Sequence, residues 1–565
     1  MNTNKRSVKL IADVCRSKGI RYAIFSPGSR SAPLVIAFSQ IPGIECIVIP
    51  DERVAGYFAL GIAQQTQNPV AVICTSGTAV LNLGPALCEA YYQHIPMLFL
   101  TADRPKGAEE RGENQAINQA FVFKEMTNAS YDIDAEMTDD TSLKQLAHQV
   151  ETSVEQTKYA VPGPVHINVR LTEPLYDLND ELAAPYDLKN FDSTKVINSE
   201  LAKKELAQQL SCTGKKLIVV GLRNADKDFV AKLQLLAVRE DTVVLAETVS
   251  NAVINDGINN YDGCIDLIGE NAGDFAPDLV ITLGNQIISK KLRQFLKTNS
   301  PQYHWDVSPY AEHRRHTIFD VRTNEHPISE NELLDVFLTS PTAKSTYAAK
   351  WKSLHQSSIA VSEQYLNKVA FSDLKVFELL TKAFPENAHL QYGNSTPIRY
   401  SNLFSHSASL YVNSNRGASG IDGCVSTAAG AAYATQQLTV CIVGDVSFFY
   451  DSNALWNKYL SPELRIIVIN NSGGNIFRLL NGPTKVSDFE KFFETRHNLN
   501  ARNLAQMYDI PYYFCDHQER LEKILATFFH PHNGKPAILE IKTDGALSAE
   551  VYKGYFDFLK NNKTT

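Results

Sequence analysis

Two short polar clusters in the last third of the chain could hold a divalent cation together with a diphosphate. Gly444, Asp445 and Ser447 follow one apolar, strand-like run, and Asn471 follows a second such run. A carboxylate oxygen from Asp445 and an amide oxygen from Asn471 are hard ligands of the kind that Mg²⁺ accepts beside phosphate oxygens and water. The turn that contains Gly444 and Ser447 can offer backbone N–H groups and a positive dipole end to a diphosphate.

The spacing of these clusters supports a single site. Asn471 lies 26 positions after Asp445, which leaves room for one crossover helix between two parallel strands that end at the same sheet edge. Either cluster alone is equally typical of a turn chosen for its tolerance of positive φ. Together they predict a metal and diphosphate site.

The elements that must position these residues form three successive α/β patterns. Apolar runs alternate with helix-like stretches, which is typical of a parallel sheet covered by helices on both faces. We therefore expect three doubly wound parallel-sheet domains: an N-terminal domain over residues 1–178, a central domain over 200–340 and a C-terminal domain over 365–565. The expected strands are Ala23–Phe25, Glu45–Ile49, Val70–Cys74, Met97–Thr101, Val165–Val169, Leu217–Gly221, Val243–Ala246, Leu279–Leu283, His304–Val307, Leu390–Tyr392, Tyr411–Asn413, Val440–Val443, Arg465–Asn470 and Ala537–Ile541. The expected helices include Arg53–Gln65, Ala79–Tyr92 and Lys350–Val369, and residues 176–200 are interpreted as a linker.

Size and composition exclude several other classes of protein. The 565 residues are too many for one hydrophobic core, and 44% hydrophobic with 21% charged residues is typical of a globular protein. The net charge of −8 argues against a nucleic-acid partner, and no run approaches the ~18 apolar residues of a membrane span. The first residues lack the apolar core of a signal peptide, and the nine cysteines form no C-x-x-C pair. We therefore expect a cytoplasmic protein with buried thiols and no stable membrane insertion.

Five longer segments carry a resemblance to a known family. They are residues 26–34 (SPGSRSAPL), 74–79 (CTSGTA), 101–105 (TADRP), 112–119 (GENQAINQ) and 414–423 (SNRGASGIDG). With the Gly-Asp and Asn-Asn clusters, they resemble the thiamine-diphosphate-dependent enzymes, and in particular the 2-succinyl-5-enolpyruvyl-6-hydroxy-3-cyclohexene-1-carboxylate (SEPHCHC) synthases of menaquinone biosynthesis. The resemblance runs from about residue 20 to residue 485 and is less distinctive in the middle. Val446 is a departure, because the general thiamine-diphosphate signature has glycine there.

The resemblance places the catalytic carboxyl group of the family at Glu52. This residue follows the strand-like run Ile47–Pro50 and opens a helix-like stretch. A carboxyl group beside the aminopyrimidine ring of thiamine diphosphate favours the tautomer that removes the thiazolium C2 proton, and burial against that ring should raise its pKa. The other reading is that Asp51 and Glu52 only favour a helix N-terminus.

The resemblance also implies a transferase (carboligase) reaction between two small anions. The 2-oxoglutarate is decarboxylated, and the resulting succinyl carbanion equivalent adds in a 1,4 sense to isochorismate. The implied metal is Mg²⁺ or Mn²⁺, and the implied assembly is a homodimer or homotetramer with cofactor sites between subunits. The two substrates carry four carboxylates, which suit the bidentate guanidinium group of arginine.

The resemblance, applied to each matching position, implies three overlapping sets of site residues. The expected substrate-binding residues are Ser29, Arg30, Arg104, Asn114, Gln115, Lys290, Lys291, Ser395, Arg399, Ile476, Phe477 and Leu480. The expected cofactor-binding residues are Glu52, Arg416, Ser419, Ile421, Gly444, Asp445, Ser447 and Asn471. The expected metal ligands are Asp445, Asn471 and Gly473. Ile421 could hold the cofactor in a bent shape, and Lys291 stands where some family members have arginine.

Some of these residues also have a purely structural interpretation. Arg104 could cap a loop, Lys290 and Lys291 could form a solvated helix face, and Ile476 and Phe477 could be ordinary core. Three histidines fall in no catalytic motif and are expected in structural or surface roles: His94, His304 and His316.

Two other functions stay open. An acetohydroxyacid-synthase-like enzyme or a simple 2-oxo-acid decarboxylase would share the three-domain plan. The three arginines Arg30, Arg399 and Arg416 argue against such an enzyme. Consumption of isochorismate would distinguish a SEPHCHC synthase from it. A non-catalytic metabolite sensor could have kept the same fold, although it would have no need of Glu52.

Overall fold

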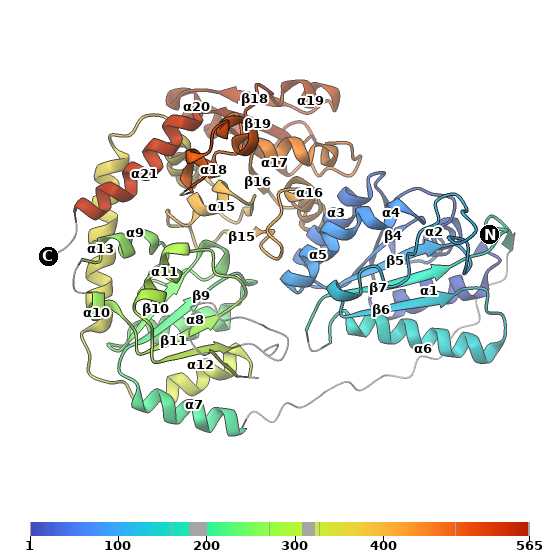
Figure 1. The fold of residues 1–565 in the computed structure, drawn as a ribbon, viewed down its shortest axis with the longest axis horizontal. Helices are drawn as coiled ribbons and strands as arrows, with labels where there is room; N and C mark the ends of the chain where they lie inside the picture. Colours follow the sequence, from blue (N-terminus) through green and yellow to red (C-terminus); the bar gives the residue numbers. More distant parts are fainter. Residues whose placement is uncertain are drawn as a thin grey trace. The chain divides into compact units, whose positions relative to one another are not determined.

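The chain contains three separate parallel sheets with helices on their faces, as the computed structural model shows (Figure 1). The structure describes residues 2–159, 161–179, 200–269, 272–307, 323–326, 328–480 and 482–562. Most of the expected linker and His316 lie outside these residues. The described residues fall into two compact units: those within Met1–Thr194, Asn415–Gln437 and Tyr450–Leu464, and those within Lys195–Ser414, Leu438–Phe449 and Arg465–Thr565.

The first unit is built around a six-stranded parallel sheet in the order β3-β2-β4-β5-β7-β6. Its strands are β2 (Tyr22–Phe25), β3 (Glu45–Val48), β4 (Val70–Cys74), β5 (Met97–Asp103), β6 (Ala129–Asp134) and β7 (Pro164–Arg170). Its helices are α1 (Arg6–Ser17), α2 (Ala32–Ser39), α3 (Glu52–Thr66), α4 (Thr78–Asn82), α5 (Gly84–Gln93), α6 (Asp140–Gln156) and α16 (Cys424–Thr435). A short antiparallel pair joins β1 (Asn2–Thr3) to β8 (Leu178–Asn179).

The expected helix Ala79–Tyr92 is two helices, which is a correction to the sequence-based prediction. The chain leaves α4 at Asn82 and begins α5 at Gly84. Pro85 lies in the first turn of α5, where its missing N–H costs nothing, whereas inside one long helix it would remove a hydrogen bond.

The second unit contains two parallel sheets. The five-stranded sheet has the order β10-β9-β11-β12-β13, and the six-stranded sheet has the order β15-β14-β16-β17-β19-β18. The strands are β9 (Lys216–Val220), β10 (Thr242–Ala246), β11 (Leu279–Leu283), β12 (Tyr303–Val307), β13 (Thr323–His326), β14 (His389–Tyr392), β15 (Tyr411–Ser414), β16 (Thr439–Gly444), β17 (Leu464–Asn470), β18 (Tyr512–Cys515) and β19 (Ala537–Lys542). The helices are α7 (Glu200–Cys212), α8 (Lys227–Ala237), α9 (Asp262–Leu267), α10 (Ala272–Phe275), α11 (Lys290–Thr298), α12 (Glu330–Thr339), α13 (Tyr347–Leu366), α14 (Asp373–Ala383), α15 (Thr396–Ser401), α17 (Asp445–Tyr450), α18 (Ile476–Leu479), α19 (Arg502–Met507), α20 (Gln518–Phe528) and α21 (Gly545–Asn561).

The two six-stranded sheets share one topology. Numbered from the first strand of each sheet, both have the order 2-1-3-4-6-5. The expected α/β class of doubly wound parallel sheets is therefore confirmed, and the three sheets fall one in each expected domain range. The domain boundaries themselves stay a prediction.

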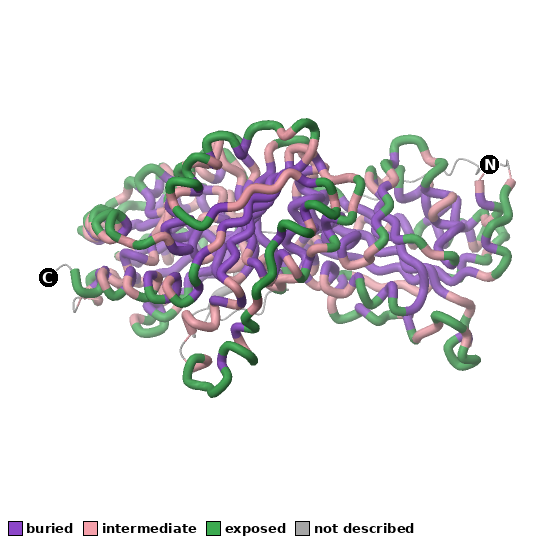
Figure 2. Tube along the Cα trace, turned by 90° about the horizontal axis from the view of Figure 1, so that it is seen from above, coloured by how far each residue is buried: buried purple, intermediate pink, exposed green. Residues whose placement is uncertain are grey.

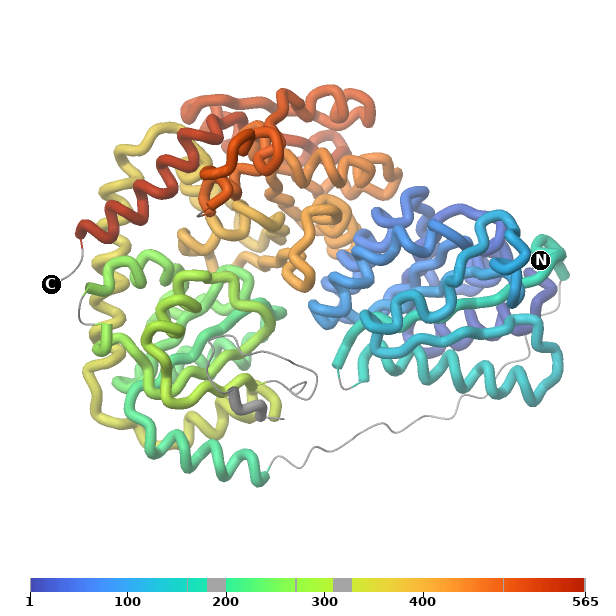
Figure 3. The backbone as a smooth tube through the Cα atoms, in the orientation of Figure 1, coloured from blue at the N-terminus to red at the C-terminus, as the bar shows by residue number. Residues whose placement is uncertain are grey.

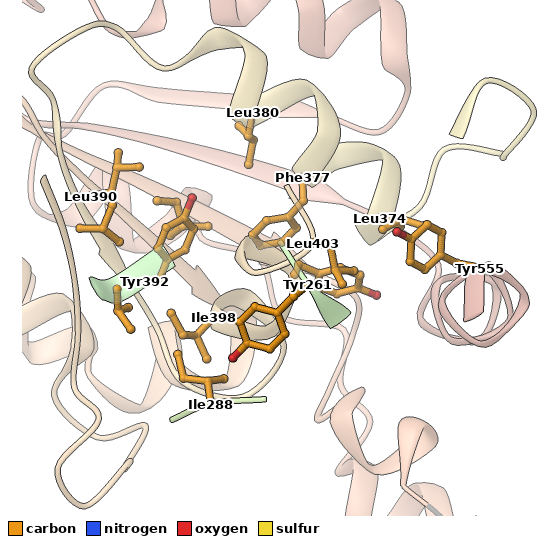
Figure 4. Close-up of a cluster of buried hydrophobic side chains, with 14 of the residues drawn as sticks. Tyr261, Ile288, Leu374, Phe377, Leu380, Leu390, Tyr392, Ile398, Leu403 and Tyr555 are labelled. Atoms are coloured by element: carbon orange, nitrogen blue, oxygen red, sulfur yellow. The ribbon is translucent and has the colours of Figure 1, made fainter. Parts of the chain in front are cut away.

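One hydrophobic core joins the two sheets of the second unit. Figure 4 shows Tyr261 and Ile288 beside Phe377, Tyr392 and Tyr555, and all five side chains are buried in the same cluster. Helix α13 links the two sheet regions along the chain and belongs to the yellow part of the tube in Figure 3. Buried residues, which include all of β9 and β11, are purple in Figure 2. This core fixes the strand ends of the second unit relative to one another.

All nine cysteines are free thiols. Most are buried as expected, but Cys212 is exposed because it ends the amphipathic helix α7 on its solvent side. No helix among the described residues is both long and apolar enough to cross a membrane.

Candidate active site

The metal and diphosphate cluster of the second unit lies at the carboxyl edge of its six-stranded sheet. Asp445 directly follows β16, Asn471 directly follows β17, and these strands are neighbours in the sheet. The backbone N–H of Gly473 donates to Oδ2 of Asp445 at 3.0 Å. The two polar clusters therefore meet at one edge, which is where parallel α/β sheets bind ligands.

Asp445 is a buried carboxylate held by backbone groups. Its Oδ1 also accepts from the N–H of Val446 at 2.7 Å, and Nε2 of His497 lies 3.5 Å from its Oδ2. Burial raises the pKa of Asp445 to about 7, although the N–H groups of Val446 and Gly473 oppose that rise. A bound cation would favour the ionised form.

The side-chain oxygen of Asn471 lies at the same edge with no hydrogen-bond partner among the described residues. Nδ2 of Asn471 donates to Oδ2 of Asp373 at 2.9 Å, while Oδ1 is buried. Gly473 has φ of +151°, and a Cβ there would lie 2.6 Å from the carbonyl oxygen of Glu494. A carboxylate, an amide oxygen without a protein partner in the described part of the chain, and a glycine turn form a donor set that fits Mg²⁺.

Glu52 is the first residue of α3, but it does not cap that helix. The N-cap is Asp51, whose Oδ1 accepts from the N–H groups of Arg53 at 2.9 Å and Val54 at 3.2 Å. Among the described residues, no side chain forms a hydrogen bond or ion pair with the Glu52 carboxyl group. Burial raises the pKa of Glu52 above its usual range, and the charge of Asp51 adds to that rise. These features leave Glu52 available for proton transfer.

The residues on each side of Glu52 are tied to Tyr450 and Asn453 of the same unit. Nη2 of Arg53 donates to the carbonyl oxygen of Tyr450 at 3.0 Å, and its guanidinium lies 4.9 Å from the centre of the Tyr450 ring. Nδ2 of Asn453 donates to Oδ2 of Asp51 at 2.8 Å. These contacts fix the backbone from which the Glu52 side chain extends.

A buried carboxylate that the sequence analysis missed holds the loop containing Arg416, Ser419 and Ile421. Glu89, on α5, accepts from the N–H groups of Gly417 at 2.6 Å, Ala418 at 2.7 Å and Ser419 at 3.2 Å. It is fully buried, and burial raises its pKa against the opposing effect of these N–H groups. Its partner Gly417 lies 328 residues further along the chain, so no local pattern in the sequence marks Glu89.

Three of the family-like segments meet in the first unit. A Cβ on Gly28 would lie 2.3 Å from Cβ of Thr75, so residues 26–34 and 74–79 are in close contact. The N–H of Gly77, which has φ of +82°, donates to Oε1 of Gln119 at 3.1 Å. Residues 112–119 therefore lie against the same turn.

The two arginines predicted in this region are already engaged by protein groups. Arg30 is buried, donates to the carbonyl oxygen of Leu171 at 2.9 Å and pairs with Glu173 at 3.1 Å. Arg104 lies 3.6 Å from Glu113, but its buried Nε has no partner within the described ranges. Three further predicted residues are exposed at the surface of this unit: Ser29, Asn114 and Gln115.

In the second unit, Arg399 and Lys291 occupy different environments. Nη1 of Arg399 donates to the carbonyl oxygen of Ser395, which has φ of +75°, and burial lowers the pKa of Arg399. Lys291 pairs with Asp266 and lies 3.7 Å above the ring of Phe556. Lys291 is therefore not a solvated lysine, whereas Lys290 is exposed.

The apolar residues predicted near the reacting centre are half-buried, so they are not ordinary core. Ile476 and Phe477 begin α18 and Leu480 follows it. The Phe477 ring packs edge-on against Phe493 at 6.0 Å between centroids. Ser447 is buried within α17.

Two of the histidines have the structural roles that were expected. His94 ends α5 in the left-handed conformation. His304 is buried on β12, its Nε2 bonds to Oγ1 of Thr282 at 3.1 Å, and burial lowers its pKa to about 4.

Comparison with known proteins assigns the chain to a class. The family model for the N-terminal TPP binding domain of thiamine pyrophosphate enzymes matches residues 5–122, and the model for their C-terminal TPP binding domain matches residues 398–541. The protein is thus a thiamine-diphosphate-dependent enzyme, and Glu52 lies in the first matched range while Asp445 and Asn471 lie in the second.

Full-length relatives give the particular family. A SEPHCHC synthase of Flavobacterium johnsoniae is 39% identical, with 97% of each chain covered. Synthases of the same name from Christiangramia forsetii and Porphyromonas gingivalis are 36% and 33% identical, and the alignments cover 98% and 99% of this chain and 98% of each relative. The chain belongs to the SEPHCHC synthase family.

Proposed function

We propose that the protein decarboxylates 2-oxoglutarate and transfers the resulting succinyl carbanion equivalent to isochorismate, which forms SEPHCHC for menaquinone biosynthesis. The observation that carries this proposal is the buried Oδ1 of Asn471, which has no partner among the described residues, at the sheet edge where Asp445 also lies. The relatives of the chain are SEPHCHC synthases along their whole length. Thiamine diphosphate, when bound, supplies the carbon centre that takes up the 2-oxo acid and stabilises the carbanion left after CO₂ departs.

Each set of protein groups has a distinct role in this proposal. Asp445, Oδ1 of Asn471 and the carbonyl oxygen of Gly473 would hold Mg²⁺ or Mn²⁺, and Gly444 and Ser447 would contact the diphosphate. Glu52 would give a proton to the aminopyrimidine ring. Burial raises the pKa of Glu52, which is the direction of shift that a proton donor requires. The loop that carries Arg416, Ser419 and Ile421 would face the cofactor.

The basic and polar residues would bind the carboxylates of the two substrates. Arg399 is suited to 2-oxoglutarate, because a half-buried guanidinium with lowered pKa gains from a carboxylate partner. We propose that Ser395 acts with Arg399, and that Ile476, Phe477 and Leu480 form an apolar wall. For isochorismate or the positioning of the intermediate we propose a separate set: Ser29, Arg30, Asn114 and Gln115. We propose that Arg104, Lys290 and Lys291 bind substrate as well, with Lys290 near a substrate carboxylate. Arg30 and Lys291 would first have to exchange or share their present partners, Glu173 and Asp266.

The proposal includes a homodimer or homotetramer with cofactor sites between subunits. It also places the protein in the cytoplasm, and the nine free thiols support such a reducing compartment.

Release of CO₂ from carboxyl-labelled 2-oxo acids tests the donor. The purified protein with thiamine diphosphate and Mg²⁺ should release CO₂ from 2-oxoglutarate in preference to pyruvate, because only the former has a distal carboxylate for Arg399. Preference for pyruvate would favour an acetohydroxyacid-synthase-like enzyme, and no release from either acid would favour a non-catalytic protein.

A further inference from the structure

Oδ1 of Asn471 can bind a metal ion only if the side-chain amide is oriented with its oxygen, and not its NH₂ group, toward the ion. The two ends of an asparagine amide are almost the same size, so the orientation is decided by hydrogen bonding. On the inner side, Nδ2 of Asn471 meets Oδ2 of Asp373 at 2.9 Å. A carboxylate oxygen accepts hydrogen bonds, so it selects the NH₂ end of the amide and leaves Oδ1, which has no partner among the described residues, on the side away from Asp373.

Asp373 is itself rigidly held. It is fully buried as the first residue of α14, where the helix dipole favours a negative charge. Its Oδ1 accepts from Oγ1 of Thr543 at 2.6 Å, and its N–H donates to Oγ of Ser548 at 3.0 Å. Thr543 directly follows β19, the neighbour of β17 in the sheet. Thr543 therefore anchors the carboxylate of Asp373, and Ser548 anchors its backbone.

We propose that Asp373 is a positioning residue that orients the Asn471 amide for the divalent cation. This inference rests on the proposed function, because it assumes that Asn471 binds the metal. Groups that orient metal ligands from behind typically change metal affinity by about 10- to 100-fold when they are removed. Asp373→Ala should therefore weaken cation binding by about that factor.

The test is direct binding of Mn²⁺ in the presence of thiamine diphosphate and without substrates. The electron paramagnetic resonance signal of the free ion measures how much Mn²⁺ remains unbound. Asp373→Ala should raise the Mn²⁺ dissociation constant about 10- to 100-fold, whereas Asp544→Asn, an exposed helix-capping aspartate at the same sheet edge, should leave it unchanged. Thermal unfolding without metal shows whether each variant is folded.

Exchanging the two side chains gives a second, independent test. Asn471→Asp alone places two carboxylates in contact and should bind Mn²⁺ poorly. The double variant Asp373→Asn/Asn471→Asp restores an amide-to-carboxylate hydrogen bond and leaves one oxygen of residue 471 for the cation. It should bind Mn²⁺ at least about tenfold more tightly than Asn471→Asp. An affinity of Asp373→Ala within about twofold of wild type, or no gain from the exchange, would overturn the inference. Absence of Mn²⁺ binding by the wild-type protein would instead contradict the proposed metal site.

Discussion

Gly61 of α3 and Gly430 of α16 lie where these two helices touch backbone to backbone. A Cβ on Gly61 would lie 2.1 Å from the carbonyl oxygen of Thr427, and a Cβ on Gly430 would lie 2.0 Å from that of Phe58. The contact is reciprocal, since each glycine receives the backbone of the other helix. Helix α3 begins with Glu52, and α16 directly follows the loop that contains Arg416, so this contact fixes two parts of the candidate site.

The Gly430→Ala substitution should therefore destabilise the first unit. A methyl group cannot fit 2.0 Å from a backbone oxygen, so the helices must separate, at a cost of about 1–3 kcal/mol as for other overpacked cores. The midpoint of urea unfolding measures this cost. Gly273→Ala is the matched control, because this helical glycine has no atom within 4 Å of the added Cβ; equal stability of the two variants would refute the close contact.

Glu52→Gln should abolish most turnover while leaving thiamine diphosphate affinity largely intact. The substitution removes a proton donor, a loss of about 10²- to 10⁴-fold in general acid–base catalysis, but it removes no expected diphosphate contact. Steady-state rates and a cofactor titration separate the two effects. The exposed Glu125 offers a control, Glu125→Gln. Turnover near the wild-type rate in Glu52→Gln would exclude the assigned role.

Glu89→Gln should weaken cofactor binding through the loop that carries Arg416. The carboxylate accepts three backbone N–H groups, whereas a glutamine would turn an NH₂ group toward at least one of them. A buried unsatisfied donor costs about 1–3 kcal/mol, so the thiamine diphosphate dissociation constant should rise about tenfold. Quenching of protein fluorescence by the cofactor measures this dissociation constant. If the constant were unchanged while the protein stayed folded, the Glu89 contacts would have no part in cofactor binding.

Much of the candidate site could be predicted from the sequence because its parts are local. Asp445 and Asn471 each follow an apolar strand, and the two strands are close in sequence. Glu89 and Asp373 could not be found in this way, because their partners lie 328 and 98 residues away. Strands β6, β13 and β18 were also missed. All three are edge strands, and β6 and β13 have polar sequences (ASYDID and TNEH) in place of an apolar run.

Glu247 should make stability fall as pH rises toward neutrality. It is fully buried at the end of β10, and burial raises its pKa from 4.5 to about 7 despite hydrogen bonds from Ile288, Ser289 and Tyr261. Between those two values the folded chain keeps a proton that the unfolded chain has lost, so the free energy of unfolding decreases with pH, by at most about 1.4 kcal/mol per unit.

Comparison with Glu247→Gln isolates this contribution from that of other groups. Urea unfolding of both proteins from pH 5 to pH 8 should show a steeper decline for the wild type. Parallel pH profiles would mean that Glu247 is ionised in the folded state throughout this range.

The most direct test of the central claim is the ultraviolet absorbance of isochorismate in the presence of the purified protein. With 2-oxoglutarate, thiamine diphosphate and Mg²⁺ present, the account predicts that the absorbance falls, and that omitting any one of these three components or the protein abolishes the fall. If isochorismate persists while CO₂ is released from 2-oxoglutarate, the cofactor site stands but the acceptor is wrong. If neither substrate is consumed by the complete mixture, the proposed synthase reaction is contradicted.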